Sequence, residues 1–420
     1  MKIEQRRTIG VLFGILGIVL VGAVAPNLDS ASRAFTFEKP PQPATLSFTP
    51  SVLVIAIGII FILTAVSTFA GPRAERWSKI ALGTSAVLFL PLIVIIGLAL
   101  STSTSTNVIQ LMVESLRLGT PIALGAMAGL WCERAGVVNI AIEGMMLASA
   151  GVGFTIYATM GDANQTSWLW ISIGCAVLTG GLIAALHAVV SVSFRVDQII
   201  SGVVINLLAI GVTGFLRSEL IVPSGSTSGV PTSNIALPLL SSLPVVGDQV
   251  FTNKPIFFSM FVVVTLSWFI LWRTRFGLRI RSVGENPHAA ETLGVNVIKM
   301  RYQAVIVGGL IAGLAGAWFS MESQGGFQDN MTNGAGFIAL AALIFGKWRP
   351  STAFLGAMLF GFTRALGSRL QILGVEVGDF EIPSELWQSL PFVVTIIVVA
   401  GAVGRAMPPA ADGVPYEPSR

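Results

Sequence analysis

The chain has 420 residues, of which 53% are hydrophobic and only 11% charged, and its mean hydropathy is +0.80. A soluble protein cannot hide this much apolar surface, so the composition excludes a soluble globular class and predicts a membrane protein. The net charge of +4 is modest, so the positions of the basic residues are more informative than their number.

Apolar stretches of membrane-spanning length recur along the whole chain. A span needs roughly 17–25 apolar residues. The sequence predicts spans at 8–25, 50–70, 80–100, 111–130, 137–160, 168–192, 199–217, 255–272, 302–321, 351–371 and 386–404. A further apolar piece at 336–346 is too short to cross comfortably. We therefore expect an all-α, polytopic membrane helix bundle with about 10–12 transmembrane helices.

Basic residues fall in alternate loops between these spans. Because Lys and Arg gather in cytoplasmic loops, we expect the loops that carry them to lie inside, both termini to be cytoplasmic, and the protein to be multi-pass in the inner or plasma membrane. The basic residues concerned are Lys2, Arg6, Arg7, Arg73, Arg76, Lys79, Arg273, Arg275, Arg279, Arg281, Lys299, Arg301, Lys347 and Arg349.

Changes in composition divide the chain into three parts. Residues 1–104 hold an N-terminal hairpin of spans and a third helix, and the proline-containing segment 26–49 is typical of an extended external linker. Residues 105–406 form the predicted core. The proline-rich stretch 407–420 is predicted to be a disordered cytoplasmic tail.

The string ERAGVVNIAIEGMM at 133–146 places polar residues inside a predicted span. Asn139 and Glu143 are four residues apart, so on a continuous helix they share one face. A carboxylate within a membrane must meet a partner, a cavity or a break in the helix, and Gly136 and Gly144 favour a break. Two interpretations stay open for Glu143: it lines a substrate path on a broken helix, or it accepts hydrogen bonds from free backbone N–H groups and fixes helix packing.

Two more residues are candidates for the same path. Asn206 lies in the middle of a span, where it either joins helices by a hydrogen bond or faces the path. Trp318 can stack a ring of a solute, although an aromatic residue in such a place more often packs between helices. The candidate path residues are therefore Asn139, Glu143, Asn206 and Trp318.

A short polar helix is predicted between two apolar spans, at 287–293. Asn286 suits the N-cap, Pro287 the first helical position, and Gly294 the left-handed residue that ends a helix. Flanking basic residues predict that this helix lies in the cytoplasm, where a soluble partner protein can bind it. The candidate contact residues are Glu285, Asn286, Pro287, Ala289, Ala290, Leu293 and Gly294.

Sequence signatures of enzymes are missing. Lys347 follows a glycine, but Trp348 comes next, so there is no GxxxxGK[ST] phosphate loop with which the chain itself would bind ATP. HExxH, GxSxG and CxxC are also absent. We expect no catalytic residue, no metal site and no cofactor.

Two motifs resemble those of a known transporter family. GENPHAAETLGV at 284–295 resembles the coupling helix of ABC-importer permeases of the ribose and branched-chain amino acid group. ERAGVVNIAIEGMM closely resembles a signature of the permeases that work with basic-membrane-protein-type binding lipoproteins, many of which import nucleosides. The resemblance covers roughly residues 105–405, and the two motifs stand in the order found in that family.

The resemblance implies a non-catalytic permease subunit with several partners. These are a separate ABC ATPase subunit that binds ATP, a second permease subunit (a copy or a paralogue), an extracytoplasmic substrate-binding lipoprotein and the lipid membrane, with no nucleic acid. Few charged residues line any plausible path, which favours a small, polar and neutral solute, and the resemblance favours a nucleoside over a simple sugar. The alternatives are a proton-coupled secondary transporter with Glu143 as the proton carrier and a membrane-embedded transferase with Glu143 as the base.

Overall fold

Long apolar helices dominate the structure, a computed structural model that describes residues 3–37, 45–70, 75–101, 103–160, 166–225, 229, 231–244, 246–374, 376–377, 380–381, 383–393 and 406–418. Within these residues, 7 helices are long and apolar enough to cross a membrane. They are Arg6–Asn27, Pro50–Phe69, Glu75–Ala99, Ser167–Ser193, Gln198–Ile221, Pro255–Arg273 and Val297–Ser323. This confirms the predicted all-α, polytopic helix bundle.

Three other long helices carry more polar residues. They are α4 (Val108–Arg134), α5 (Ile142–Met160) and α14 (Pro350–Ile372). The predicted span at 137–160 is wrong at its start, because residues 135–141 are not helical and α5 begins only at Ile142. The last predicted span, 386–404, falls largely outside the described residues; α15 (Ser384–Gln388) stands near its start.

The chain divides into two compact units, and unit 1 comprises Met1–Glu114, Pro244–Gln249 and Thr363–Gly404. In unit 1, α1 (Ile3–Val19) packs on α2 (Pro50–Phe69), which also packs on α3 (Glu75–Ala99). Val54, Phe61 and Leu92 are buried in their shared apolar core. Side chains on the outer surfaces of these helices are largely apolar and exposed, as a membrane solvent requires.

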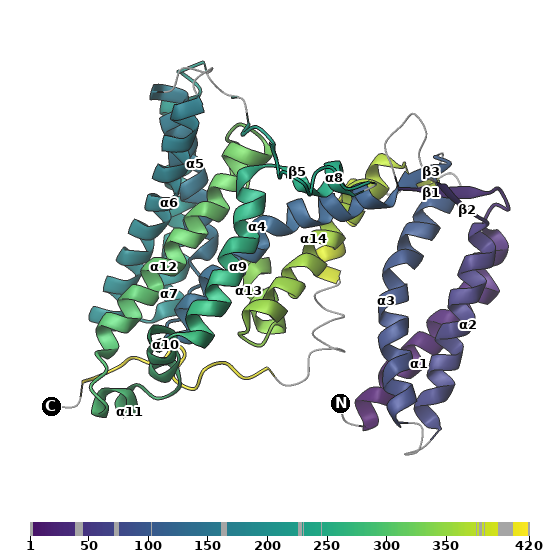
Figure 1. Cartoon of the computed structure of the whole chain (residues 1–420), viewed down its shortest axis with the longest axis horizontal. Helices are drawn as coiled ribbons and strands as arrows, with labels where there is room; N and C mark the ends of the chain where they lie inside the picture. The colour runs from purple at the N-terminus through teal and green to yellow at the C-terminus, as the bar shows by residue number, and fades with distance from the viewer. Residues whose placement is uncertain are drawn as a thin grey trace. The chain divides into compact units, whose positions relative to one another are not determined.

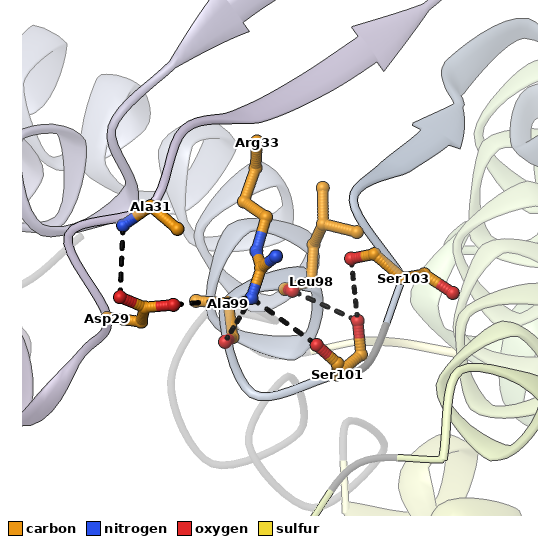
Figure 2. Close-up of polar contacts among 7 residues, drawn as sticks. All are labelled: Asp29, Ala31, Arg33, Leu98, Ala99, Ser101 and Ser103. Carbon is orange, nitrogen blue, oxygen red and sulfur yellow. Dashed lines mark hydrogen bonds and ion pairs between the residues drawn. The ribbon is translucent and has the colours of Figure 1, made fainter.

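A small three-stranded sheet stands at one end of the α1–α3 bundle. Strand β1 (Arg33–Thr36) pairs antiparallel with β2 (Thr45–Phe48) and parallel with β3 (Ser105–Asn107). Figure 2 shows how Arg33 fastens the sheet to the end of α3: its guanidinium donates to the carbonyl oxygens of Ala99 and Ser101, both at 3.4 Å. The segment predicted as a plain extended linker therefore contains paired strands on either side of residues 38–44.

Unit 2 comprises Ser115–Leu243, Val250–Phe362 and Arg405–Arg420. Its centre is a bundle of α5, α6 (Thr166–Ala188), α7 (Gln198–Leu216) and α12 (Val297–Ala317), in which α5 contacts the other three and α12 lies along α6 (Figure 1). Small residues permit the close approach of α6 and α12, since a Cβ on Gly180 would lie 2.3 Å from the carbonyl oxygen of Gly309. Wider π-helical turns extend three of these helices, at Val189–Ser193 (η4), Arg217–Ile221 (η5) and Trp318–Ser323 (η6).

Unit 2 contains further helices beside this bundle and near one of its ends. Helix α9 (Pro255–Arg273) is followed by two short polar helices, α10 (Arg275–Glu285) and α11 (Pro287–Thr292), near one end of the unit (Figure 1). The short apolar helix α13 (Ala335–Phe345) matches the predicted non-crossing piece. Minor elements of the chain are η1 (Leu20–Val24), η2 (Ala25–Asn27), β4 (Ile235–Ala236), α8 (Gly247–Phe251), β5 (Thr252–Asn253), β6 (Glu376–Val377) and β7 (Phe380–Glu381).

The C-terminal segment 406–418 differs from the disordered tail that its composition suggested. It contains no helix or strand, yet Pro409, Ala411 and Tyr416 are buried in unit 2. The physical reason is that its few apolar side chains and its backbone groups find partners on α10, α11 and α12, which a composition-based prediction does not take into account.

Candidate functional site

A break in the helical backbone separates α4 from α5. We call residues 135–141 the break; within it Gly136 has a φ of +80°. Glycine adopts this left-handed conformation without steric cost, and a Cβ on Gly136 would lie only 2.9 Å from the carbonyl oxygen of Ala411. Five of the seven residues of the break are buried, so protein rather than lipid surrounds its non-helical backbone, as membrane proteins require.

Asn206 of α7 replaces hydrogen bonds that the broken helix loses. Its Oδ1 accepts from the N–H of Gly144 at 2.7 Å, and its Nδ2 donates to the carbonyl oxygen of Ile140 at 3.0 Å. The close contact also needs Gly144, because a Cβ there would lie 2.8 Å from the Cα of Asn206. Asn206 therefore joins α7 to the break by two hydrogen bonds.

Two further side chains hold Val138 in the middle of the break. Its N–H donates to Oε1 of Gln198 at 2.7 Å, and its carbonyl oxygen lies 3.1 Å from Nε2 of His187. His187 is held in turn by Ser201, whose hydroxyl lies 3.0 Å from Nδ1. Helices α6 and α7 thus supply the polar groups that the backbone of the break requires.

Glu143 binds the N-terminal end of α13. Its Oε1 accepts from the hydroxyl of Thr332 at 2.6 Å and from the N–H of Gly334 at 2.9 Å, and its Oε2 accepts from the N–H of Gly336 at 2.6 Å. A helix N-terminus has free N–H groups and a positive dipole end, which together favour a carboxylate. These contacts are those of the second interpretation of Glu143, in which the carboxylate accepts hydrogen bonds from backbone N–H groups.

Asn139 lies in the break and is fully buried. It is not on a common helical face with Glu143, because Glu143 is in the first turn of α5 and Asn139 precedes that helix. Its Nδ2 contacts the sulfur atoms of Cys132 at 3.3 Å and Met145 at 3.7 Å, both weak acceptors. Its Oδ1 has no hydrogen-bond partner in the described part of the chain, which leaves a buried acceptor free to bind water or a solute.

Trp318 is buried in η6, and its ring meets that of Phe319 edge-on with 5.1 Å between centroids. Asn139, Glu143 and Asn206, by contrast, belong to one connected group, because Asn206 binds the residues adjacent to both of the others. The four candidate path residues thus comprise three around the break and one packed beside an aromatic neighbour.

The polar residues that complete this group were not found from the sequence. Gln198, His187, Thr332, Gly334 and Gly336 each contribute a hydrogen bond to the break or to Glu143. A signal for the last three exists: a short apolar helix preceded by Thr-Asn-Gly leaves backbone N–H groups free at its N-terminus, and these need an acceptor. No pattern in the sequence pairs His187 and Gln198 with Val138.

Helix α11 forms as its end signals predict. Oδ1 of Asn286 accepts from the N–H of Ala289 at 3.0 Å, Pro287 occupies the first turn, and Gly294 follows the helix with a φ of +79°. Glu285, just before α11, is already engaged within the chain: its Oε1 lies 3.6 Å from Nη1 of Arg134.

The outward face of α11 differs from the predicted one. Ala290 is only 3% exposed and packs against the body of unit 2, whereas Leu293 is 84% exposed. His288, Ala289 and Thr292 are also exposed. The surface that α11 offers to a partner therefore consists of His288, Ala289, Thr292 and Leu293, which we call the outer face, and Ala290 lies on the opposite side.

Metal ligation finds no support in the described residues, among which no three or more His, Cys, Asp or Glu side chains are grouped to hold an ion. The groups that the break brings together are amides, hydroxyls, an imidazole and one carboxylate already bound to three donors. Such a set can recognise polar groups and fix backbone, and it offers no pair of titratable groups arranged for acid–base catalysis.

Comparison with known proteins gives consistent results. Residues 111–399 match the family model for the permease component of branched-chain amino acid transport systems. A nucleoside ABC transporter permease of Lactococcus lactis, NupC, is 39% identical over 75% of this chain and 99% of its own length. A guanosine ABC transporter permease of Bacillus subtilis, NupQ, is 40% identical over 70% of this chain and 92% of its own. A putative glucose ABC transporter permease of Haloferax volcanii, TsgC13, is 36% identical over 69% and 91%. No solved structure matches the chain.

Proposed function

Because the chain belongs to the family of branched-chain amino acid transport permeases, we propose that it is the membrane-spanning permease subunit of an ABC importer of nucleosides. The observation that carries this proposal is the 39–40% identity to nucleoside and guanosine permeases over 92% or more of their length. The apolar helices of unit 2 support a multi-pass subunit of the membrane.

In this proposal α11 is the coupling helix. This short, capped and polar helix lies between two longer helices, and its outer face carries the exposed side chain of Leu293. An apolar side chain among polar residues suits a groove on a soluble ATPase subunit. ATP binding and hydrolysis belong to that subunit, so this chain is not an enzyme and carries no cofactor. The other proposed partners are a second permease subunit and an extracytoplasmic binding lipoprotein.

The break is the proposed moving part of the substrate path. Discontinuous helices supply free backbone and polar side chains at the depth where transporters bind their solutes. Here the buried Oδ1 of Asn139, which has no hydrogen-bond partner among the described residues, is the group available to a solute. Glu143 does not contact the solute in this proposal and instead holds α13 in place. A neutral solute with hydroxyl or amide groups fits such an environment better than a charged one.

A simple sugar is the second candidate solute. The relative from Haloferax volcanii carries a putative glucose assignment at 36% identity, only slightly below the two nucleoside relatives. Both solutes present hydroxyl groups, so the break by itself does not separate them. A nucleoside is preferred because the two more similar relatives are named for nucleosides.

Orientation follows from the charges of the loops. The basic residues of α10 and of the start of α12 favour a cytoplasmic position for α11, and in this proposal both termini are on the same side. This is the side on which an ATPase subunit is available, which is consistent with the proposed role of α11.

Uptake by the reconstituted complex tests the proposal. The permease, its ATPase and its binding lipoprotein in proteoliposomes are expected to take up a radiolabelled nucleoside only with ATP and the lipoprotein, and to continue when a protonophore collapses the proton gradient. An excess of unlabelled glucose should not compete. Uptake that runs without ATP and stops with the protonophore would replace this proposal by the proton-coupled transporter.

A further inference from the structure

The C-terminal segment 406–418, which we call the strap, crosses several elements of unit 2. Figure 1 shows it running past α10 toward α11. It lies beyond residue 399, where the match to the family model ends. Its contacts reach the break, α10, α11, α12 and the segment between α6 and α7.

The first half of the strap is bound to the end of α10 and to the break. The N–H of Ala411 donates to the carbonyl oxygen of Gly284 at 2.9 Å, and the N–H of Ala410 donates to Oε2 of Glu285 at 3.3 Å. On its other side, the carbonyl oxygen of Ala411 approaches Gly136 so closely that a Cβ there would lie 2.9 Å away. The strap thus touches the end of α10 and the break with the same residue.

The end of α10 also lies directly on the break. A Cβ on Gly284 would lie 2.2 Å from the carbonyl oxygen of Arg134 and 3.3 Å from the backbone nitrogen of Gly136. No side chain of Gly284 separates the two backbones. The strap lies at this contact, because Ala411 touches both Gly284 and Gly136.

The second half of the strap is anchored by Tyr416. This side chain is 6% exposed, and its ring lies 5.3 Å from the ring of His288 on α11. The buried guanidinium of Arg301 on α12 lies 5.9 Å from the centre of the same ring and donates to the carbonyl oxygen of Val414 at 3.1 Å. Beyond the anchor, Glu417 pairs with Arg195 at 2.7 Å.

We propose that the strap is a mechanical link that transmits the movement of α11 to the break between α4 and α5, with Tyr416 as its positioning residue. Tyr416 meets α11 at His288 and Ala411 meets the break at Gly136, so one short segment touches both the element that is pushed and the element that must move. The inference rests on the proposed function, because it requires that a partner moves α11.

A link of this kind has a measurable signature that a merely stabilising tail lacks. If the strap only stabilised the fold, its loss would lower the amount of assembled complex and leave each remaining complex fully active. If the strap transmits movement, complexes without it assemble and hydrolyse ATP but move less solute for each ATP consumed.

The experiment measures nucleoside uptake per ATP hydrolysed in proteoliposomes with the complete complex. Tyr416→Ala removes the anchor, Tyr416→Phe keeps its ring, and Val414→Ala shortens a nearby side chain that is 50% exposed. We expect the ratio to fall at least about fivefold in Tyr416→Ala, within the usual range of coupling between sites, while the ATPase subunit still co-purifies. Tyr416→Phe and Val414→Ala should keep most of the ratio.

A second measurement, the labelling of a buried cysteine, does not depend on the solute. Cys132 is fully buried, and its sulfur lies 3.3 Å from Nδ2 of Asn139 in the break. In a Cys175→Ala background, ATP turnover should raise the rate at which a small thiol reagent labels Cys132, and this rise should be lost in Tyr416→Ala.

The two proposals fail in different ways. If the parental complex does not take up nucleosides with ATP, the proposed function fails, whatever the variants do. If the parental complex is active and Tyr416→Ala keeps both the uptake per ATP and the rise in Cys132 labelling, the strap is no link. Loss of the ATPase subunit from Tyr416→Ala would equally overturn the inference, because the strap would then be part of the docking surface.

Discussion

Two buried carboxylates in unit 2 do the same physical task. Glu143 accepts from backbone N–H groups at the start of α13, and Glu322 accepts from those of Ile256 and Phe257 at the start of α9, at 2.6 and 3.0 Å. A buried charge without partners would cost several kcal/mol. Each carboxylate offsets that cost by binding donors that the helix itself leaves free. An acidic residue within a membrane segment is therefore not by itself evidence of a proton carrier.

The geometry of Glu143 predicts a graded response to substitution. In Glu143→Gln the amide oxygen can still accept from Thr332 and Gly334, but the amide nitrogen then faces the N–H of Gly336. We expect a stability loss of about 1–3 kcal/mol, the cost of one unmatched buried donor, and reduced but measurable ATP-dependent uptake. Thermal unfolding and uptake assays would show it, with the exposed Glu219→Gln as the control. Complete loss of uptake in a correctly folded, stable Glu143→Gln protein would support the proton carrier instead.

Asp412 in the strap gives a pH dependence with a defined sign. Burial raises the pKa of Asp412 to about 7, while the positive charge of Arg301 acts to lower it; Glu133 of α4 also interacts with it. In a released strap the carboxyl of Asp412 would have the ordinary aspartate pKa of about 3.9. The packed strap holds the proton of Asp412 more tightly than the released strap does. The contribution of Asp412 to the stability of the packed strap is therefore fully present below about pH 4 and is lost as the pH rises through 7.

We therefore expect the strap to be released more readily at about pH 8 than at about pH 5.5. The fraction of chains that proteinase K trims from the C-terminus, measured by intact mass, should rise accordingly. Asp412→Asn, which has no charge to bury, should show nearly the same fraction at both values. A pH dependence that persists unchanged in Asp412→Asn would assign the effect to another group.

At the scale of single elements, α11 shows what a sequence pattern can and cannot predict. Its start and end depend on Asn286, Pro287 and Gly294, which act within a few residues of each other, so the sequence is sufficient. Which side of a two-turn helix is buried depends instead on how the helix packs against the rest of unit 2, including the strap, which is distant in sequence. For this reason Ala290 was expected to face a partner, yet it is buried.

The outer face of α11 yields a direct test of docking. Leu293→Asp places a charge on the 84% exposed apolar residue of this face, and we expect the ATPase subunit to bind at least about tenfold more weakly, as for loss of a central interface anchor. Co-purification and ATP-dependent uptake measure this. Leu239→Asp is the matched control, since Leu239 is 86% exposed in the segment that precedes α9, whereas α11 lies beyond the other end of α9. Equal weakening by both substitutions would speak against α11 as the docking element.

The break is an element that the sequence predicts only in part. Gly136 and Gly144 indicated that the helix is interrupted, because glycine permits left-handed backbone and close approach. The partners that make the interruption stable, Asn206 and Gln198, are about 60 residues further along the chain. Such pairs depend on how α7 packs against α5, and no local pattern encodes that packing.

At the scale of the whole molecule, hydropathy predicted the helices well because lipid demands apolar, internally hydrogen-bonded segments. It could not predict the sheet of β1, β2 and β3 in unit 1, whose strands are short and whose β3 residues lie 71 positions from their partners in β1, as in the pair Thr36 and Asn107. Nor could it predict the packed strap. Unit 1 begins well before residue 111, where the family match starts, so its N-terminal helices add to the part shared with that family.

The orientation of unit 2 is the property on which the docking and strap proposals both depend, and it can be tested by labelling. Single cysteines at Ser242 and Thr292, both exposed, are introduced into a Cys175→Ala background; the native Cys132 is fully buried. Because basic residues flank α11 on both sides, we expect a membrane-impermeant maleimide to label Ser242→Cys in intact cells and Thr292→Cys only after permeabilisation. The labelled fraction is measured by mass spectrometry. The Cys175→Ala protein without an added cysteine is the blank. Labelling of Thr292→Cys in sealed cells would place α11 outside, where no ATPase subunit could reach it, and would remove the basis of both proposals.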